Sequence, residues 1–360
     1  MERAQLANHC HPLAGAQAGF RGALRRAAEA GRLCKAGRGA GGWGESLLLI
    51  DYHNGIYAFD AGYVRPLLAA IHLIESEGRA AFVDTANFEI MPQALAALEA
   101  RGLGPESVDY VILTHIHLDH AGGAGVMMEA FPNAKLVVHP RGARHMVEPS
   151  KLMAGVEGVY GRERARRMYG SLVPIPAERI IEAHDNTVLT LGSRELLCID
   201  APGHAKHHIA IVDRQSSGIF TGDTFGISYR ELDVEGRPLI MPSSTPIQFD
   251  PDEMRASIER MLSFNPDAVY LTHFSRLAPP AELGRKVLRL LDRYVDIALG
   301  ASAADDKTAV IRDGLTRLLL DEARHHGVRI SDQNIHEIWH LDLELNAQGL
   351  AYWLEAQIAA

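Results

Sequence analysis

The amino-acid sequence predicts an α/β domain that is followed by a helical extension. Between residues 46 and 278, short apolar runs with the length of β-strands alternate with segments of helical composition. From Pro279 onward, the apolar residues recur only with helical spacing. We therefore expect a disordered or non-native leader at residues 1–45, a main domain at residues 46–278 and an accessory helical region at residues 279–360.

The composition is typical of a soluble globular protein, and we expect a small-molecule substrate. Apolar residues make up 47% of the chain, charged residues make up 22%, and the net charge is −9. This charge argues against a nucleic-acid partner, and no run reaches the roughly 18 apolar residues of a membrane span. The three cysteines (Cys10, Cys34 and Cys198) are too scattered for a disulfide framework, and no secretory signal is visible, so we expect a cytoplasmic protein.

Two hairpins are expected at the start of the main domain. Asn54-Gly55 and Gly78 are their turn residues, because these residue types favour tight turns between strands. The expected strands are 47–50, 56–59, 71–75, 80–84, 108–113, 135–139, 187–189, 196–200, 209–212, 218–220 and 268–272, and the expected helices are 92–101 and 251–264. Residues 141–178 form an insertion with helical patterning, where we expect a lid or a substrate wall.

The densest group of metal-ligand residue types is the segment Thr-His-Ile-His-Leu-Asp-His at residues 114–120. Side chains alternate along an extended segment, so His115 and His117 point the same way and can bind one metal ion. Asp119 and His120 follow where the chain turns into a helix, and they suit a second ion. A purely structural cluster is the alternative, but burying so many polar side chains without partners is unfavourable.

Three later turns carry histidine or aspartate after strand-like runs. They are Pro202-Gly203-His204, Thr221-Gly222-Asp223 and Thr272-His273. Because each follows an apolar strand-like run, we expect these side chains to meet the 114–120 segment at one edge of the sheet.

In this order, the four segments resemble the metal-binding motifs of the metallo-β-lactamase-fold superfamily. The resemblance covers roughly residues 47–275 and implies a four-layer αββα sandwich, with residues 279–360 as a C-terminal helical extension. It implies a first metal ion held by His115, His117 and His204 and a second held by Asp119, His120 and His273, with Asp223 bridging the two.

The resemblance also implies a mechanism with two divalent ions. Zinc is favoured by the imidazole-rich ligand set, and iron or manganese is compatible with the bridging carboxylate. A hydroxide between ions about 3.5–4 Å apart would attack the carbonyl of an ester, thioester or lactone. Asp119 would orient the nucleophile and move its proton, and Tyr229, in the loop at residues 225–249, would donate a hydrogen bond to the oxyanion.

Three classes of function are compatible with these residues. A hydrolase similar to glyoxalase II or to the acyl-homoserine-lactone hydrolases is favoured, although Lys206-His207 departs from the small residues usual after the third histidine. The alternative is an iron-loaded oxidoreductase similar to persulfide dioxygenases, or a diiron oxygen-binding protein. A metal-binding scaffold without activity fits least well, because no ligand is missing.

Other polar residues are expected to support the ligands. Val83-Asp84-Thr85 resembles the early Asp-Thr-Gly element of the superfamily, with Ala86 in place of the glycine. The resemblance implies that Asp84 supports the metal loop, by which we mean residues 114–120. The other interpretation is an ordinary carboxylate at the end of a strand. His208 is expected to hydrogen-bond near a ligand, whereas the sequence assigns no role to His207.

The helical tail contains a second pattern of metal-ligand type. His336-Glu337-Ile338-Trp339-His340 matches the zinc-protease helix His-Glu-x-x-His. The pattern is short, no protease-type continuation follows, and a complete ligand set lies elsewhere, so we expect an ordinary terminal helix. We expect the tail to pack on the main domain or on a second subunit in a homodimer.

Overall fold

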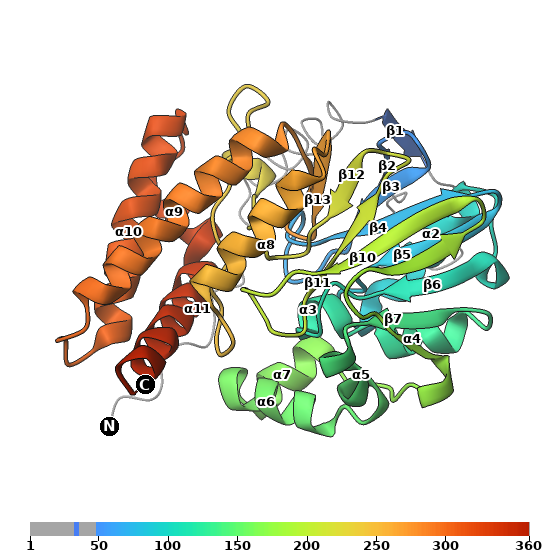
Figure 1. The fold of residues 1–360 in the computed structure, drawn as a ribbon, viewed down its shortest axis with the longest axis horizontal. Helices are drawn as coiled ribbons and strands as arrows, with labels where there is room; N and C mark the ends of the chain where they lie inside the picture. The colour runs from blue at the N-terminus through green and yellow to red at the C-terminus, as the bar shows by residue number, and fades with distance from the viewer. Residues whose placement is uncertain (1–31, 36–47, 360) are drawn as a thin grey trace.

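Two mixed β-sheets lie face to face in the computed structural model, which describes residues 32–35 and 48–359 (Figure 1). The strands of the first sheet lie in chain order: Arg32–Lys35 (β1), Leu48–Asp51 (β2), Ile56–Asp60 (β3), Ala70–Ser76 (β4), Arg79–Val83 (β5), Val108–Ile112 (β6), Lys135–Val138 (β7) and Ile180–Glu182 (β8). The order in the second sheet is Ser275–Leu277 (β14), Ala268–Leu271 (β13), Gly218–Phe220 (β12), Ile209–Asp213 (β11), Arg194–Asp200 (β10) and Thr187–Leu191 (β9).

Helices flank the two sheets and complete a four-layer αββα sandwich (Figure 1). The α-helices are Met91–Ala100 (α2), Leu118–Ala121 (α3), Ala124–Ala130 (α4), Pro140–Val147 (α5), Ser150–Tyr160 (α6), Arg162–Tyr169 (α7), Pro251–Ser263 (α8), Pro280–Gly300 (α9), Lys307–His326 (α10) and Asp332–Ala359 (α11). Short 3-10 helices are Phe88–Ile90 (η1), Pro105–Ser107 (η2), Ala177–Arg179 (η3) and Arg230–Leu232 (η4). The fold class that the sequence predicts is therefore confirmed.

Successive strand residues alternate between two clusters of buried apolar residues. Ile56 and Ala58 of β3 belong to a buried cluster that also contains Leu196 and Cys198 of β10, and this cluster lies between the sheets. Phe59 of β3 faces the other way, into the cluster beneath the helices. Since successive side chains point to opposite faces of a strand, apolar residues on both faces are what the inner layers of a sandwich require.

The sheet topology brings the ends of several strands to one edge. β5 and β6 are parallel neighbours in the first sheet, as are β12 and β13 in the second. β10 and β12 both pair antiparallel with β11, so β10 runs in the same direction as β12 and β13. The loops that follow β10, β12 and β13 therefore leave the second sheet at the same edge.

The tail is helical, as expected, and its helices α9, α10 and α11 pack on one another (Figure 1). Within the described ranges, no helix is long and apolar enough to cross a membrane. The three helices α5, α6 and α7 begin at Pro140 and end at Tyr169, so they occupy most of the segment 141–178 where helical patterning is expected. Of the leader expected at residues 1–45, residues 32–35 form β1, which pairs with β2, and the remainder lies outside the described residues.

Candidate metal centre

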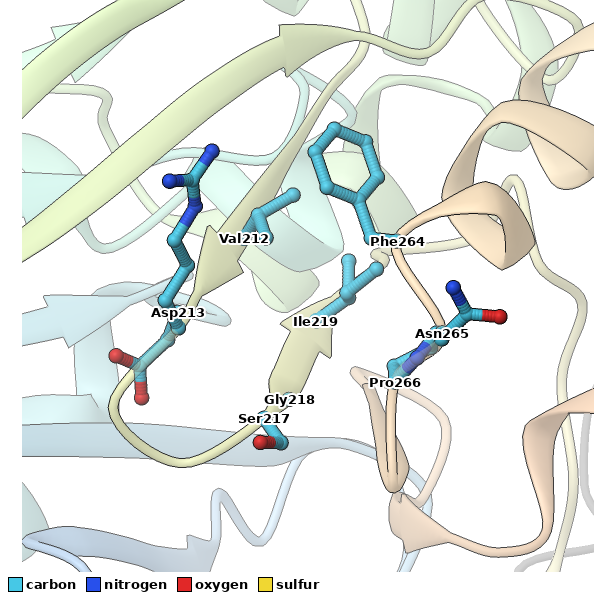
Figure 2. A pocket seen from close by; sticks show the side chains of 9 residues that line it. Val212, Asp213, Ser217, Gly218, Ile219, Phe264, Asn265 and Pro266 are labelled. Atoms are coloured by element: carbon cyan, nitrogen blue, oxygen red, sulfur yellow. The ribbon is translucent and has the colours of Figure 1, made fainter.

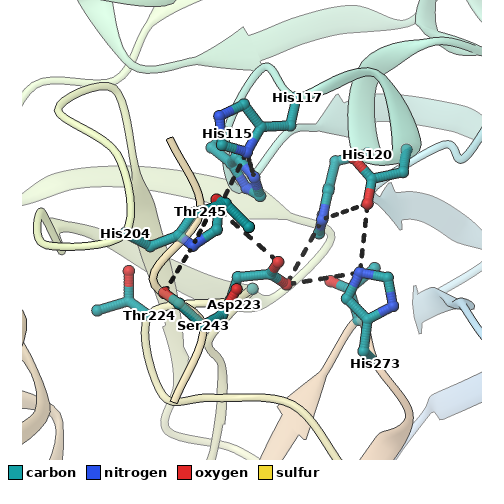
Figure 3. A network of polar contacts seen from close by, with 12 residues as sticks. His115, His117, His120, His204, Asp223, Thr224, Ser243, Thr245 and His273 are labelled. Atoms are coloured by element: carbon teal, nitrogen blue, oxygen red, sulfur yellow. Dashed lines mark hydrogen bonds and ion pairs between the residues drawn. The ribbon is translucent and has the colours of Figure 1, made fainter. Parts of the chain in front are cut away.

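The seven ligands expected from the sequence meet at one edge of the sandwich (Figure 3). Their ligand atoms form three overlapping groups in which all atoms lie within 4.8 Å of one another. The groups are His115, His117 and His204; His115, His120 and Asp223; and Asp119, His120 and His273. The shared members show that this is one centre with two neighbouring binding points.

The first binding point consists of three imidazoles. His117 Nδ1 lies 2.9 Å from His115 Nε2 and 3.0 Å from His204 Nε2. Nitrogen ligands around a tetrahedral zinc ion are separated by about 3.3 Å, so a small adjustment suffices to admit the ion. Burial and the neighbouring imidazoles lower the pKa of His115 and His117 well below the usual value, which keeps them in the neutral form that binds metal.

The second binding point combines two imidazoles with two carboxylates. His273 Nε2 lies 3.4 Å from Asp119 Oδ2 and 3.8 Å from Asp223 Oδ1. His120 Nε2 lies 3.4 Å from the same Asp223 oxygen. The other oxygen of Asp223, Oδ2, lies 3.8 Å from His204 Nε2 at the first binding point. Asp223 therefore stands between the two points, with one oxygen directed toward each (Figure 3).

The electrostatics of the second point favour positive charge. Burial alone would lower the pKa of His273, but Asp223 and Asp119 outweigh it and raise the pKa to about 8. In the same way, burial acts to raise the pKa of Asp223, but His120 and His273 hold it well below its usual range. The carboxylates are thus ionised at neutral pH, and a bound cation would satisfy them.

Unpartnered atoms also show that these residues fit metal ions. His120 Nε2 and Asp223 Oδ1 are buried and have no hydrogen-bond partner among the described residues. Buried polar atoms almost always have a hydrogen-bond partner. The absence of one at both of these atoms, which lie 3.4 Å apart, therefore points to a missing ligand between them. A metal ion that both atoms bind is such a ligand.

Most of the histidine ligands are oriented by a hydrogen bond from the second ring nitrogen. His120 Nδ1 donates to Asp84 Oδ2 at 2.8 Å, and His273 Nδ1 donates to the Leu68 carbonyl at 2.7 Å. His204 Nδ1 donates to the Ser243 carbonyl at 3.1 Å. Such bonds fix which nitrogen faces the metal and make it a better ligand.

Asp84 connects two ligand-bearing segments beneath the centre, residues 114–120 and the turn at Thr272-His273. Besides His120, it accepts hydrogen bonds from the Thr114 backbone at 2.8 Å and from the Thr272 hydroxyl at 2.7 Å. These segments carry ligands from both sheets, so Asp84 holds them in register. The expectation that Asp84 supports the metal loop is confirmed.

Replacing Asp84 with asparagine is expected to weaken binding of the second metal ion by about 10–100-fold, because removing such a supporting partner lowers metal affinity by that amount. The affinity is measured by competition with a chromophoric chelator. Asp109→Asn is the matched control, since Asp109 is a strand carboxylate paired with Arg79 and is not among the ligands. Equal affinities in the two variants would contradict the role of Asp84.

The two histidines after the third ligand have different surroundings. His208 Nε2 accepts a hydrogen bond from the Asp223 backbone at 3.2 Å, so its expected supporting role is confirmed. His207 packs its ring 5.6 Å from the ring of His117, and its Nδ1 is buried without a partner among the described residues.

Two of the ligand turns require glycine. Gly222 has φ +49°, and a Cβ there would lie 2.5 Å from His208 Nε2. Gly203 has φ +126°, and a Cβ there would overlap the backbone of Met254 at the start of α8. Both turns therefore depend on a left-handed backbone and a close approach that only glycine permits.

Tyr229 lies beside the second binding point. Its backbone neighbour Ser228 donates to the His273 carbonyl at 2.6 Å, which places the tyrosine next to that ligand. The phenol hydroxyl donates to Asp342 of α11, with both carboxylate oxygens at 3.0 Å. The oxyanion role expected for Tyr229 stays a prediction, and the partner Asp342 was not found from the sequence. Its only sequence signal is a polar residue on the buried side of a helix.

The His-Glu-x-x-His pattern lies on α11, as expected for a terminal helix. His336 and His340 are exposed, and their ring centroids lie 5.6 Å apart with the rings tilted by 43°. Neither belongs to a candidate metal group in the part of the chain that the structure describes.

A cavity of about 360 Å³ lies elsewhere in the second sheet (Figure 2). Its walls include Ile219, Phe264 and Pro266. It includes Gly218 at the beginning of β12, whereas Asp223 follows the end of this strand, so the cavity and the metal centre lie at opposite ends.

The fold and the ligand arrangement are those of a metallo-β-lactamase-type protein, and the sequence comparison agrees. Residues 64–273, more than half of the chain, match the model of the metallo-beta-lactamase superfamily. The chain therefore belongs to this superfamily, as the sequence motifs indicate.

Among its relatives is the metallo-beta-lactamase fold-containing protein ST1585 of Sulfurisphaera tokodaii, 24% identical over 206 residues that cover 56% of this chain and 74% of the relative. The solved structure of ST1585 superposes with a TM-score of 0.58 at 21% identity, covering 83% of this chain and 98% of that one.

Two further relatives are named as enzymes. A hydroxyacylglutathione hydrolase of Xanthomonas campestris is 28% identical over 167 residues, or 46% of this chain and 48% of the relative. The acyl-coenzyme A thioesterase MBLAC2 of Gallus gallus is 29% identical over 136 residues, or 34% and 43%. The chain thus spans about half the length of these two relatives.

Proposed function

We propose that the protein is a metal-dependent hydrolase that cleaves an ester, thioester or lactone of a small molecule. The observation that carries the proposal is the complete set of seven ligands in overlapping groups. Two bound divalent ions, most favourably zinc, would supply a nucleophilic hydroxide at neutral pH and polarise the carbonyl. The two relatives that are named for hydrolysis of acyl compounds support this choice.

The residues of the metal centre would have two roles, metal binding and proton transfer. His115, His117 and His204 would hold one ion, Asp119, His120 and His273 the other, with Asp223 between them. The side chain of Asp119 is 28% exposed, against 7% for Asp223. Asp119 is therefore the carboxylate that can reach an attacking water, orient it and accept its proton.

The test begins with metal-free protein that is reloaded with zinc, iron or manganese. Elemental analysis is expected to give two zinc ions per chain. The zinc protein is then assayed with a panel of esters, thioesters, lactones and phosphoesters, and we expect turnover of at least one carbonyl substrate. A fully loaded zinc protein without hydrolysis, together with an iron protein that consumes oxygen or oxidises a persulfide, would replace the hydrolase by the iron-loaded oxidoreductase.

A further inference from the structure

His117 is the histidine on the solvent side of the first binding point. Its side chain is partly exposed, whereas His115 and His204 are 0% and 1% exposed. His117 turns Nδ1 toward the other two rings, so its Nε2 lies on the opposite edge of the ring (Figure 3). Of the three ligands of the first binding point, His117 is therefore the one that a metal ion from solvent meets first.

His117 is also the least restrained of the histidine ligands. Each of the other four holds its second ring nitrogen against an oxygen, at distances from 2.7 to 3.2 Å. His117 Nε2 has no hydrogen-bond partner among the described residues. Because such bonds fix the orientation of a ligand ring, His117 can turn more easily than the other four.

His207 lies within reach of a turned His117. The two rings pack edge to face, with their centroids 5.6 Å apart and their planes at 90°. For comparison, the centroids of His117 and His204, which share the first binding point, lie 4.9 Å apart. Two imidazoles that bind one ion at about 2.0–2.1 Å have centroids about 5 Å apart. His117 and His207 can therefore share an ion after a small shift and a rotation of the rings.

A buried nitrogen of His207 lacks a partner. The residue is 9% exposed, and its Nδ1 has no hydrogen-bond partner among the described residues. Buried polar atoms almost always have a partner, and an imidazole nitrogen that binds an ion acquires one. The burial of His207 beside His117 thus resembles the situation of His120 Nε2 in the metal centre itself.

The turn that carries His207 is fixed relative to the ligands. The Lys206 backbone donates to Gln248 Oε1 at 2.9 Å, and the Ile209 backbone donates to the Thr114 carbonyl at 2.7 Å. His207 therefore has a defined position beside the first binding point, and the mobile partner of the pair is the ring of His117.

We propose that His207 and His117 form an entry site for divalent metal ions. His207 captures an ion together with the outward-turned ring of His117. His117 then turns back toward His115 and His204 and delivers the ion to the first binding point. The inference concerns the loading of the metal centre, so it applies whether the loaded protein is a hydrolase or an oxidoreductase.

The rates of metal uptake and release test the entry site. Metal-free protein is mixed with Co²⁺ in a stopped-flow instrument, where the visible absorbance of bound Co²⁺ gives the rate of uptake, and an excess of EDTA added to the loaded protein gives the rate of release. In His207→Ala we expect both rates to fall by about tenfold or more, the lower end of the effect that residues around a metal site have. An entry site changes the path and not the end states, so the two rates should fall by the same factor and leave the dissociation constant unchanged.

Two further substitutions separate metal binding from ring packing. His207→Cys keeps a metal ligand but loses the ring, whereas His207→Phe keeps a ring but loses the nitrogens. We expect His207→Cys to recover much of the wild-type rate and His207→Phe to be as slow as His207→Ala. His325→Ala is the matched control and should keep the wild-type rates, since His325 is an exposed histidine of α10 that belongs to no candidate metal group.

Three results would overturn the proposal. They are wild-type rates in His207→Ala, recovery in His207→Phe without recovery in His207→Cys, and a weaker affinity that comes from faster release alone. In the second case His207 would only position His117, and in the third it would be a ligand of the loaded centre. No substrate enters these measurements, so a protein that shows the expected rates but hydrolyses nothing would contradict the proposed function and still support the entry site.

Discussion

Replacing Asp223 with alanine is expected to release at least one of two metal ions and to lower turnover by about a thousandfold or more, a barrier increase of about 4 kcal/mol. Asp223 is the only ligand whose two oxygens face different binding points, His204 on one side and His120 and His273 on the other. Without it, the buried imidazoles of the two points lose the anion between them.

Metal content by elemental analysis and kcat on the best substrate of the panel check this prediction. Asp267→Ala is the control, since Asp267 is an exposed carboxylate that precedes β13, at the opposite end of this strand from His273. The control should bind two ions and retain its activity. An Asp223→Ala protein with two ions and wild-type turnover would contradict the bridging position.

The metal ligands could be found from the sequence because each lies in a short local pattern. His115, His117, Asp119 and His120 fall within six residues, and the remaining ligands follow strands directly. A strand end is a local property, and strands that run in the same direction bring their ends to one edge. The local sequence patterns therefore predict the metal ligands even though the long-range contacts between the strands are not known.

The long-range contacts beside the metal centre could not be found in this way. Tyr229 and Asp342 are separated by 113 residues, and Arg65 and Glu231 by 166. None of these residues stands in a pattern that distinguishes it from a solvated surface residue. The contact between Tyr229 and Asp342 depends on how the helical tail packs on the sandwich, and the pair Arg65–Glu231 depends on how two distant segments of the main domain meet. Periodicity alone determines neither.

The prediction of the strands was limited in the same way. Long apolar strands such as β4 and β10 were expected at nearly their observed positions, because a run of apolar residues of strand length leaves a clear signal in the sequence. The three-residue strand β14 was not expected, since Ser275 and Arg276 are polar and the strand forms only by pairing with β13. Short strands of this kind are defined by their neighbour rather than by their composition.

Replacing Gly349 with alanine is expected to destabilise the protein by about 1–3 kcal/mol or more, as overpacking of a tight contact does. A Cβ at Gly349 would overlap the carbonyl oxygen of Ser244 and lie 2.7 Å from the Thr245 carbonyl carbon. Alanine is otherwise favoured over glycine in a helix by about 1 kcal/mol, so the sign of the effect separates packing from helix propensity.

The same substitution should also weaken the first metal site, because the loop that Gly349 contacts carries Ser243, the partner of His204. Thermal unfolding and chelator competition on the zinc-loaded protein measure the two effects. Gly155→Ala is the control, as this helical glycine has open space around it and the substitution should be neutral or stabilising. If Gly349→Ala matched Gly155→Ala in stability and metal affinity, α11 would be a separate appendage. The expected joint loss would instead make the helical tail a structural part of the metal centre, because α11 then holds the loop whose Ser243 carbonyl accepts the hydrogen bond of His204.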